Sequence, residues 1–461
     1  MVLCYQAVSS VLRGIEPLIV LEQLGATFFY ASLQMVVKDR SVNASYPNAS
    51  LSSEESQQKF ISDFYMIYYL ILQVAPILPA VLLAKIGDRR WRKAPVVVPP
   101  LGYLPCSLVL LLVVLLRLPL EVMFGAGTLF GLCGGFCTFW SGVMTVTSLG
   151  CTAADRSKVL MRMELLYGLV GVAGNLVSGH LFLLCSSSLG RGTVALIVSA
   201  LMILLCLIHA VGLLQINEIK QEPEENRQAL SDDPHIRMEA PAGINKVNMV
   251  LLFAAAVLYG NAMTGAVTML GTFVMKQPLN WNATQLGYGN AADSVIFCTS
   301  FLGVVVFRRC VNEIVLILIG MVSFGSGIFF MSFVTAPYMF YLARSLNMFA
   351  VIPMPTIRSL LSQQVPASSC GITLTSLHVS VKVASLAYIP AFTKIYQKTL
   401  SWFPGFVFTL SASLTVLAMI PISIISCRSA QNHLNEKILE NGGTDINETL
   451  QQENVSDTEI V

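Results

Sequence analysis

Apolar runs long enough to cross a membrane follow one another along almost the whole chain. A helix that spans the hydrocarbon core of a bilayer needs about 20 mostly apolar residues, and twelve runs of about this length can be read along the sequence. The runs lie at 14–37, 62–84, 95–117, 120–149, 159–185, 193–216, 248–274, 285–307, 313–334, 337–361, 370–393 and 403–427. The pattern therefore predicts an all-α membrane protein with twelve transmembrane helices.

A single long polar segment divides these runs six and six. Residues 217–247 are rich in Glu, Asp, Pro and Asn and poor in apolar residues, which is typical of a solvated linker. We predict an N-terminal six-helix half (1–216), this cytoplasmic linker, a C-terminal six-helix half (248–427) and a cytoplasmic acidic tail (428–461). Two six-helix halves joined by a hydrophilic linker are typical of the major facilitator superfamily fold, whose halves are repeats.

Composition supports a membrane protein and excludes several other classes. The chain has 461 residues, of which 55% are hydrophobic and 12% charged, and a soluble protein usually carries about twice that charge. The net charge of +2 gives no reason to expect a nucleic-acid partner. No C-x-x-C pair or His/Cys cluster has metal-ligand spacing, so we expect neither a metal nor a cofactor. No nucleophile–base constellation is visible, so an enzyme is not expected.

Basic residues and glycosylation sequons predict the orientation. Lysines and arginines concentrate in the short segments 84–93, 156–162 and 308–309, and short loops rich in these residues face the cytoplasm. Both termini are therefore expected in the cytoplasm. The first run contains Glu16 and Glu22, so it is better interpreted as an uncleaved first spanning helix than as a signal peptide. Asn-x-Ser/Thr acceptors fall in loops that this topology places outside, which predicts glycosylation at Asn43, Asn48 and Asn282.

The segment 84–93, AKIGDRRWRK, is a degenerate copy of the loop G-x-x-x-D-R-x-G-R-K between helices 2 and 3 of major-facilitator transporters. Asp88, Arg89 and Arg92 stand where that pattern has them, while Ala84 and Trp91 replace its two glycines. Topology alone explains the basic residues but does not require an aspartate directly before an arginine. The resemblance implies that the Asp caps a neighbouring helix and pairs with basic groups when one gate is closed, so we predict a gating role for these three residues.

Ionisable groups inside spanning helices are costly unless paired or facing water, so each is a functional candidate. Glu164 lies about one turn into the fifth run and is either a proton site or an interfacial acid paired with Arg162 or Lys158. Asp293, in the eighth run, is either an acid lining a cavity or a hydrogen-bond partner between helices. We predict that Glu164 and Asp293 carry the proton of a coupled transporter.

Basic side chains in the tenth and eleventh runs are candidates for binding an anion. Arg358 follows two prolines that break the tenth run; a broken helix is tolerated where it lines a cavity, and an arginine there can clamp a carboxylate or sulfate. The alternative is a cation that snorkels to the cytoplasmic surface. Lys382 and His378 lie four apart on one helical face and could line the pore together, although the histidine could also be an ordinary packed side chain. Arg344 is more consistent with a structural role.

Longer strings resemble the solute-carrier family that contains the proton-coupled folate transporter. They include IEP (15–17), FWSGVM (139–144), GYG (287–289), GMVSFGSG (320–327) and TIRS (356–359). The resemblance implies proton-driven uptake of organic anions, with Arg358 and Tyr288 at the substrate. The family's coupling Glu on helix 5 aligns with Tyr167, one turn after Glu164, and its helix 7 histidine aligns with Met263.

We therefore expect a proton-coupled symporter that imports anionic organic solutes (muropeptide-like, steroid-sulfate-like or folate-like) by alternating access. Arg358, Tyr288 and Lys382 are the predicted substrate-binding residues. Its partners would be a small organic anion, protons and the lipid bilayer, at the plasma membrane or, alternatively, an endolysosomal membrane. The alternative from another class is a non-transporting receptor or chaperone that retains the carrier fold, which the substitutions at the family's coupling positions favour.

Overall fold

The computed structural model describes residues 13–42, 53–89, 91–149, 156–184, 191–215, 246–307, 310–364, 367–429 and 431. Within these ranges the chain is helical and contains no strand. Ten helices among the described residues are long and apolar enough to cross a membrane. The predicted all-α membrane fold is therefore confirmed. The predicted linker and tail lie almost entirely outside the described ranges, so the division into four parts stays a prediction.

The N-terminal half contains eight α-helices and one short π-helical turn within its described residues. They are α2 (Glu16–Ser41), α3 (Ser53–Val74), α4 (Ile77–Arg89), α5 (Ala94–Leu115), α6 (Val122–Leu132), α7 (Gly135–Leu149), α8 (Arg156–Leu183), α9 (Thr193–Ile208) and η1 (His209–Leu213). Two runs predicted as single helices are interrupted. Pro76 lacks the N–H that would continue α3 into α4, and Gly134 and Gly135, with φ of +98° and +60°, separate α6 from α7.

The C-terminal half contains the remaining helices. They are α11 (Lys246–Val274), α12 (Ala283–Phe307), α13 (Glu313–Met331), α14 (Pro337–Leu346), α15 (Pro353–Gln363), α16 (Ala367–Thr399) and a last helix, Phe406–Ser429. The predicted run 337–361 is thus two short helices, because the prolines at 353 and 355 start a new helix rather than continue the old one. The run 370–393 lies inside α16. These two runs account for the difference between the twelve predicted spans and the ten apolar helices of the described residues.

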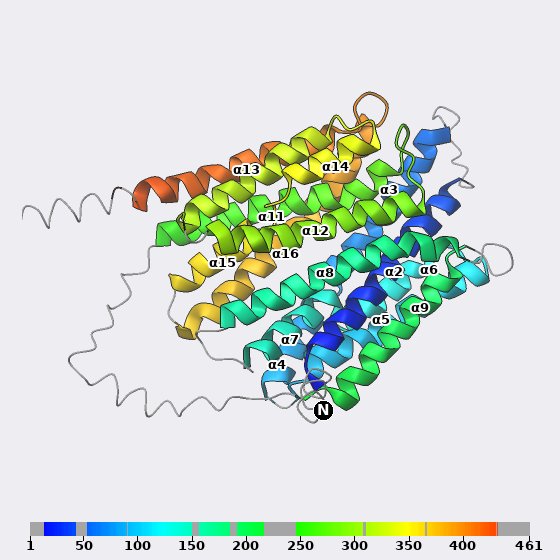
Figure 1. The fold of residues 1–461 in the computed structure, drawn as a ribbon, viewed down its shortest axis with the longest axis horizontal. Coiled ribbons are helices and arrows are strands. Elements are labelled where there is room, and N and C mark those ends of the chain that lie inside the picture. The colour runs from blue at the N-terminus through cyan, green and yellow to red at the C-terminus, as the bar shows by residue number, and fades with distance from the viewer. Residues whose placement is uncertain are drawn as a thin grey trace, which may run out of the picture.

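The two halves lie side by side and meet along two seams. Figure 1 shows the helices of the N-terminal half (blue to green) beside those of the C-terminal half (green to red). α8 packs along α12, and α3 packs against α16. The continuation of α3, α4, packs instead on α5 and α7 of its own half.

The seam between α8 and α12 depends on glycines. A methyl group at Gly179 of α8 would come within 2.6 Å of Thr284 Cα and would also meet the Ala283 carbonyl oxygen. One turn earlier, Asn175 Nδ2 donates a hydrogen bond to Ser294 Oγ of α12 at 3.1 Å. Small residues let two backbones approach closely in a membrane, so the seam is both tight and held by polar contacts.

Replacing Gly179 with alanine is expected to weaken this packing. The new methyl group meets backbone atoms, which cannot move aside as the end of a flexible side chain can, so we expect a loss of about 1–3 kcal/mol. Thermal unfolding of the detergent-solubilised protein, followed by size-exclusion chromatography, measures the effect. Gly125→Ala in α6 is the matched control, because no atom lies within 4 Å of its added methyl group. Equal losses in the two variants would contradict the close approach of α8 and α12.

Candidate functional site

Two predicted site residues of opposite charge come from different halves. Glu164, on α8, and Arg358, on α15, lie within electrostatic range of each other. Among the described side chains they form no direct ion pair, so the arginine is not neutralised by contact. Arg358 is exposed and Glu164 half-buried. An uncommitted guanidinium with a carboxylate opposite it is suited to bind an anion whose affinity depends on the charge of that carboxylate.

Two further basic side chains extend this cluster. His378, on α16, lies within electrostatic range of both Lys382 and Arg358. His378 is exposed and Lys382 half-buried. The structure thus places Glu164 near Arg358, and His378 near both Arg358 and Lys382. The roles of these residues in binding stay predictions.

A cavity of about 270 Å³ adjoins the cluster. Its walls combine the carboxyls of Glu164 and Glu313 with the aromatic rings of Phe297 and Phe301 of α12 and with the hydroxyl groups of Thr356 and Ser359 of α15. Apolar walls with a few polar groups are typical of small-molecule sites. The cavity lies where the two halves meet, which is where a carrier with two related halves binds its substrate.

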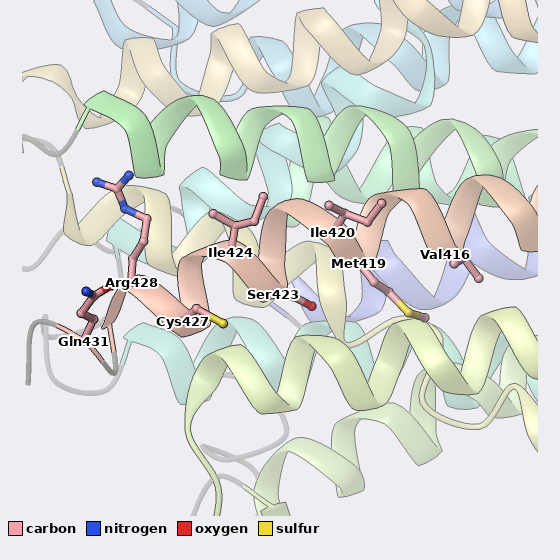
Figure 2. Close-up of a pocket in the computed structure, with 8 residues that line it drawn as sticks. All are labelled: Val416, Met419, Ile420, Ser423, Ile424, Cys427, Arg428 and Gln431. Carbon is pink, nitrogen blue, oxygen red and sulfur yellow. The ribbon is translucent and has the colours of Figure 1, made fainter. Parts of the chain in front are cut away.

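A second pocket, of about 490 Å³, shares no lining residue with this cavity or the cluster (Figure 2). It is lined by Val416, Met419, Ile420, Ser423, Ile424, Cys427, Arg428 and Gln431, which follow one another along the last helix and its end. Most of these side chains are apolar, and the pocket is shaped by a single helix rather than by the two halves. The interface cavity is therefore the better candidate for a transport site, although it is the smaller of the two.

Tyr288 lies on the same seam at a different level. Its hydroxyl is 3.0 Å from Nε2 of His180 on α8, and 40% of the residue is exposed. Phe297, which lines the cavity, is nine residues further along α12, which is about 13 Å of helix. The structure thus separates Tyr288 from the Arg358 cluster and pairs it with a histidine that the sequence analysis did not select.

Asp293 is paired inside its own half. Its Oδ1 is 2.6 Å from Nη2 of Arg344 on α14, and only 7% of the Arg344 side chain is exposed. The guanidinium also lies 5.3 Å from the centre of the Phe340 ring, within the range of a cation–π contact. Such a pair is expected if Asp293 is a hydrogen-bond partner between helices and Arg344 has a structural role. Because the partners are 51 residues apart, no local pattern in the sequence signals the pair.

The predicted gate and glycosylation residues are described only in part. Asp88 and Arg89 end α4, but their side chains lie outside the described residues, and Arg92 precedes α5. Asn43 and Asn48 also lie outside the described ranges. Asn282 is exposed at the start of α12. It forms a capping box with Gln285, in which each side-chain oxygen accepts a hydrogen bond from the other's backbone N–H, at 2.9 and 3.1 Å. Glycosylation there stays a prediction.

Polar contacts join the two halves at the end of the bundle where α2 ends and α3 begins, the α2–α3 end. Lys38 Nζ donates hydrogen bonds to Asn280 Oδ1 at 2.6 Å and to the Trp281 carbonyl oxygen at 2.8 Å. Asp63 of α3 forms a 3.1 Å ion pair with Lys394 of α16. The positive-inside pattern predicts that this end is external. Sequence reasoning missed these contacts because each depends on how one half docks on the other.

Comparison with known proteins places the chain in a family. Residues 2–381 match the family described as Major Facilitator Superfamily. Solute carrier family 46 member 2 of Canis lupus familiaris is 37% identical over 452 residues, which cover 90% of this chain and 93% of that protein. The lysosomal proton-coupled steroid conjugate and bile acid symporter of Homo sapiens is 26% identical over 379 residues, 82% of each chain. The solved POT family transporter PepTSo covers 90% of this chain and 98% of that chain at 12% identity, with a TM-score of 0.61, which is a likeness of fold.

These matches confirm the resemblance that the sequence strings indicate. Within the family the strings point to the thymic stromal cotransporter homolog, which is solute carrier family 46 member 2, and this relative matches along nearly the whole chain. The family and the similar proteins are transporters and not enzymes. The chain therefore belongs to the Major Facilitator Superfamily and, within it, to solute carrier family 46.

Proposed function

We propose that this membrane transporter is a proton-coupled symporter of small organic anions that works by alternating access. The observation that carries the proposal is the cluster of Arg358, Lys382 and His378 opposite Glu164 at the interface of the halves. A relative 26% identical to this chain is named as a proton-coupled symporter of steroid conjugates and bile acids, which are anionic organic molecules. That relative is also named as lysosomal, which supports the endolysosomal alternative for the location.

Competition for Arg358 explains how proton and anion binding can be coupled. While Glu164 is ionised, its charge attracts the guanidinium that the substrate anion needs. Protonation of Glu164 removes this competitor, so the anion binds more tightly to the protonated carrier. By reciprocity, a bound anion also favours the protonated carrier. In this mechanism Arg358 and Lys382 hold the anion, and Tyr288 contacts it at a second level of the seam.

Alternating access requires the contacts at the α2–α3 end to break. Ion pairs between exposed side chains, such as Asp63 with Lys394, contribute only about 0.2–1 kcal/mol each. A bound substrate can therefore shift the balance between the two orientations. The loop residues Asp88, Arg89 and Arg92 would form the corresponding contacts at the opposite end when the carrier reverses.

Substitution of Arg358 tests the anion site. Loss of a hydrogen-bonded charge costs about 1.5–3 kcal/mol, so Arg358→Gln is expected to raise the KM for the anion roughly 10- to 100-fold. Uptake of labelled steroid sulfate, muropeptide and folate in transfected cells at about pH 5.5 and 7.4 measures this. Arg428→Gln, in the pocket of the last helix, is the matched control and should transport normally.

The proton assignment is tested in the same assay. Glu164→Gln should bind the anion without a competing charge and lose the stimulation of uptake by acid. Acid-stimulated uptake that survives in a variant lacking both Glu164 and Asp293 carboxyls would refute the assignment of the proton to these residues. An absence of uptake of every test compound, in cells that display the protein at their surface, would favour the receptor alternative.

The Asp293–Arg344 pair allows a separate test of whether Asp293 carries a proton or holds the fold. Asp293→Asn leaves a buried guanidinium without its counter-charge, so we expect a loss of about 3–5 kcal/mol and little folded protein. The double variant Asp293→Asn with Arg344→Gln should recover much of the folded yield, measured by size-exclusion chromatography. Lys394→Gln, which breaks an exposed pair, should unfold almost like the wild type. Normal folding of Asp293→Asn with loss of acid stimulation would instead identify Asp293 as the proton carrier.

A further inference from the structure

A third carboxyl lies in the membrane-spanning part of the N-terminal half. Glu22, in the middle of α2, is 4% exposed. Its Oε2 atom is buried and has no hydrogen-bond partner among the described residues. A carboxylate in such a place would carry an uncompensated charge inside the membrane, which costs several kcal/mol. The side chain therefore needs either a cation or a proton.

The neighbours of Glu22 supply no cation. The titratable groups within electrostatic range of its carboxyl are Tyr30, Tyr103, Tyr167 and Cys206, from α2, α5, α8 and α9. The other elements packed on α2 carry Tyr69 of α3, His209 of η1 and Asp293 of α12. Among the described side chains, none of the ion pairs includes Glu22. Glu164 and Asp293, by contrast, each have an arginine nearby that favours their charged form.

Glu22 is connected to the candidate site through Tyr167. This tyrosine lies one turn from Glu164 on α8, and its ring packs edge-on against Phe297, with ring centres 6.2 Å apart. Phe297 lines the interface cavity together with Glu164. Next to Glu22, the Gln23 side chain and Ser294 of α12 both lie against Gly171 of α8. The seam between α8 and α12 therefore lies close to the part of α2 that carries Glu22.

From this geometry we infer that Glu22 is a proton-binding site of the carrier, occupied while the α8–α12 seam is closed and released when the seam opens to water. The proton takes the place of the missing cation, and Tyr167, which contacts Phe297 of the cavity wall, lies between Glu22 and the cavity. The inference rests on the proposed proton coupling and adds to it a carboxyl that lies outside the anion-binding cluster.

Difference infrared spectroscopy of the purified protein in lipid, between acidic and neutral pH, tests the site without transport. A carboxylic acid C=O band is expected in the wild type, and the component that belongs to Glu22 should be lost in Glu22→Gln while the component of Glu164 remains. Glu16→Gln, the same substitution at the less buried start of α2, is the matched control and should keep the band. Persistence of the complete band in Glu22→Gln would overturn the inference.

Transport provides the second readout. Glu22→Gln should reduce acid-driven uptake by about tenfold or more while leaving exchange of substrate across the membrane nearly unchanged, because exchange requires no net proton movement. Glu22→Asp keeps a carboxyl and should retain acid stimulation. This variant still tests the site if the glutamine variant folds poorly. Normal acid stimulation in Glu22→Gln, together with its loss in Glu164→Gln, would overturn the role of Glu22 and leave the proposed function standing. A band that depends on Glu22 in a protein that takes up no anion would support the proton site at Glu22 and refute the proposed function.

Discussion

The close approach of α8 and α12 is the constraint on which the rest of the structure depends. Apolar side chains gain little by leaving lipid, so helices in a bilayer associate through close packing and hydrogen bonds. Gly179 leaves no room for a side chain at this seam, and Asn175 bonds to Ser294 across it. Glu164 and Tyr288 both lie along it. The same contact that joins the halves therefore sets the spacing of the candidate site.

The three acids of the membrane interior differ in what compensates their charge. Asp293 has a direct partner in Arg344, and Glu164 faces Arg358 at a distance that leaves the arginine available. Glu22 forms no ion pair with a described side chain. Position 167, where the family resemblance implies a coupling acid, carries a tyrosine, and the Glu22 carboxyl approaches that tyrosine from the adjacent helix. A carboxyl is thus present near the expected place, although a different helix supplies it.

Sequence reasoning was reliable where a local physical rule decides the structure. Backbone groups in lipid must be satisfied within the helix, so apolar length alone predicted the spans, and the prolines before Arg358 marked a real break. The polar pairs were not predictable in this way. Lys394 and Asp63 are 331 residues apart, and their contact follows from the docking of two halves. The sequence marked Glu22 as one of several ionisable groups inside spanning helices, but its lack of a partner depends on α5, α8 and α9 together.

The interruption between α14 and α15 separates two arginines that a continuous helix would have joined rigidly. The backbone groups of the interruption are satisfied by hydroxyls of neighbouring helices, since Ser300 accepts from the Val351 N–H and Ser323 from the Phe349 N–H. On α14, Arg344 forms the ion pair with Asp293 of α12. The 11-residue helix α15 carries Arg358. The break gives the two arginines separate supports, because α14 packs on α12 and α13 whereas α15 packs on α11, α13 and α16. A single predicted span therefore places one arginine inside its own half and the other opposite a carboxyl of the other half.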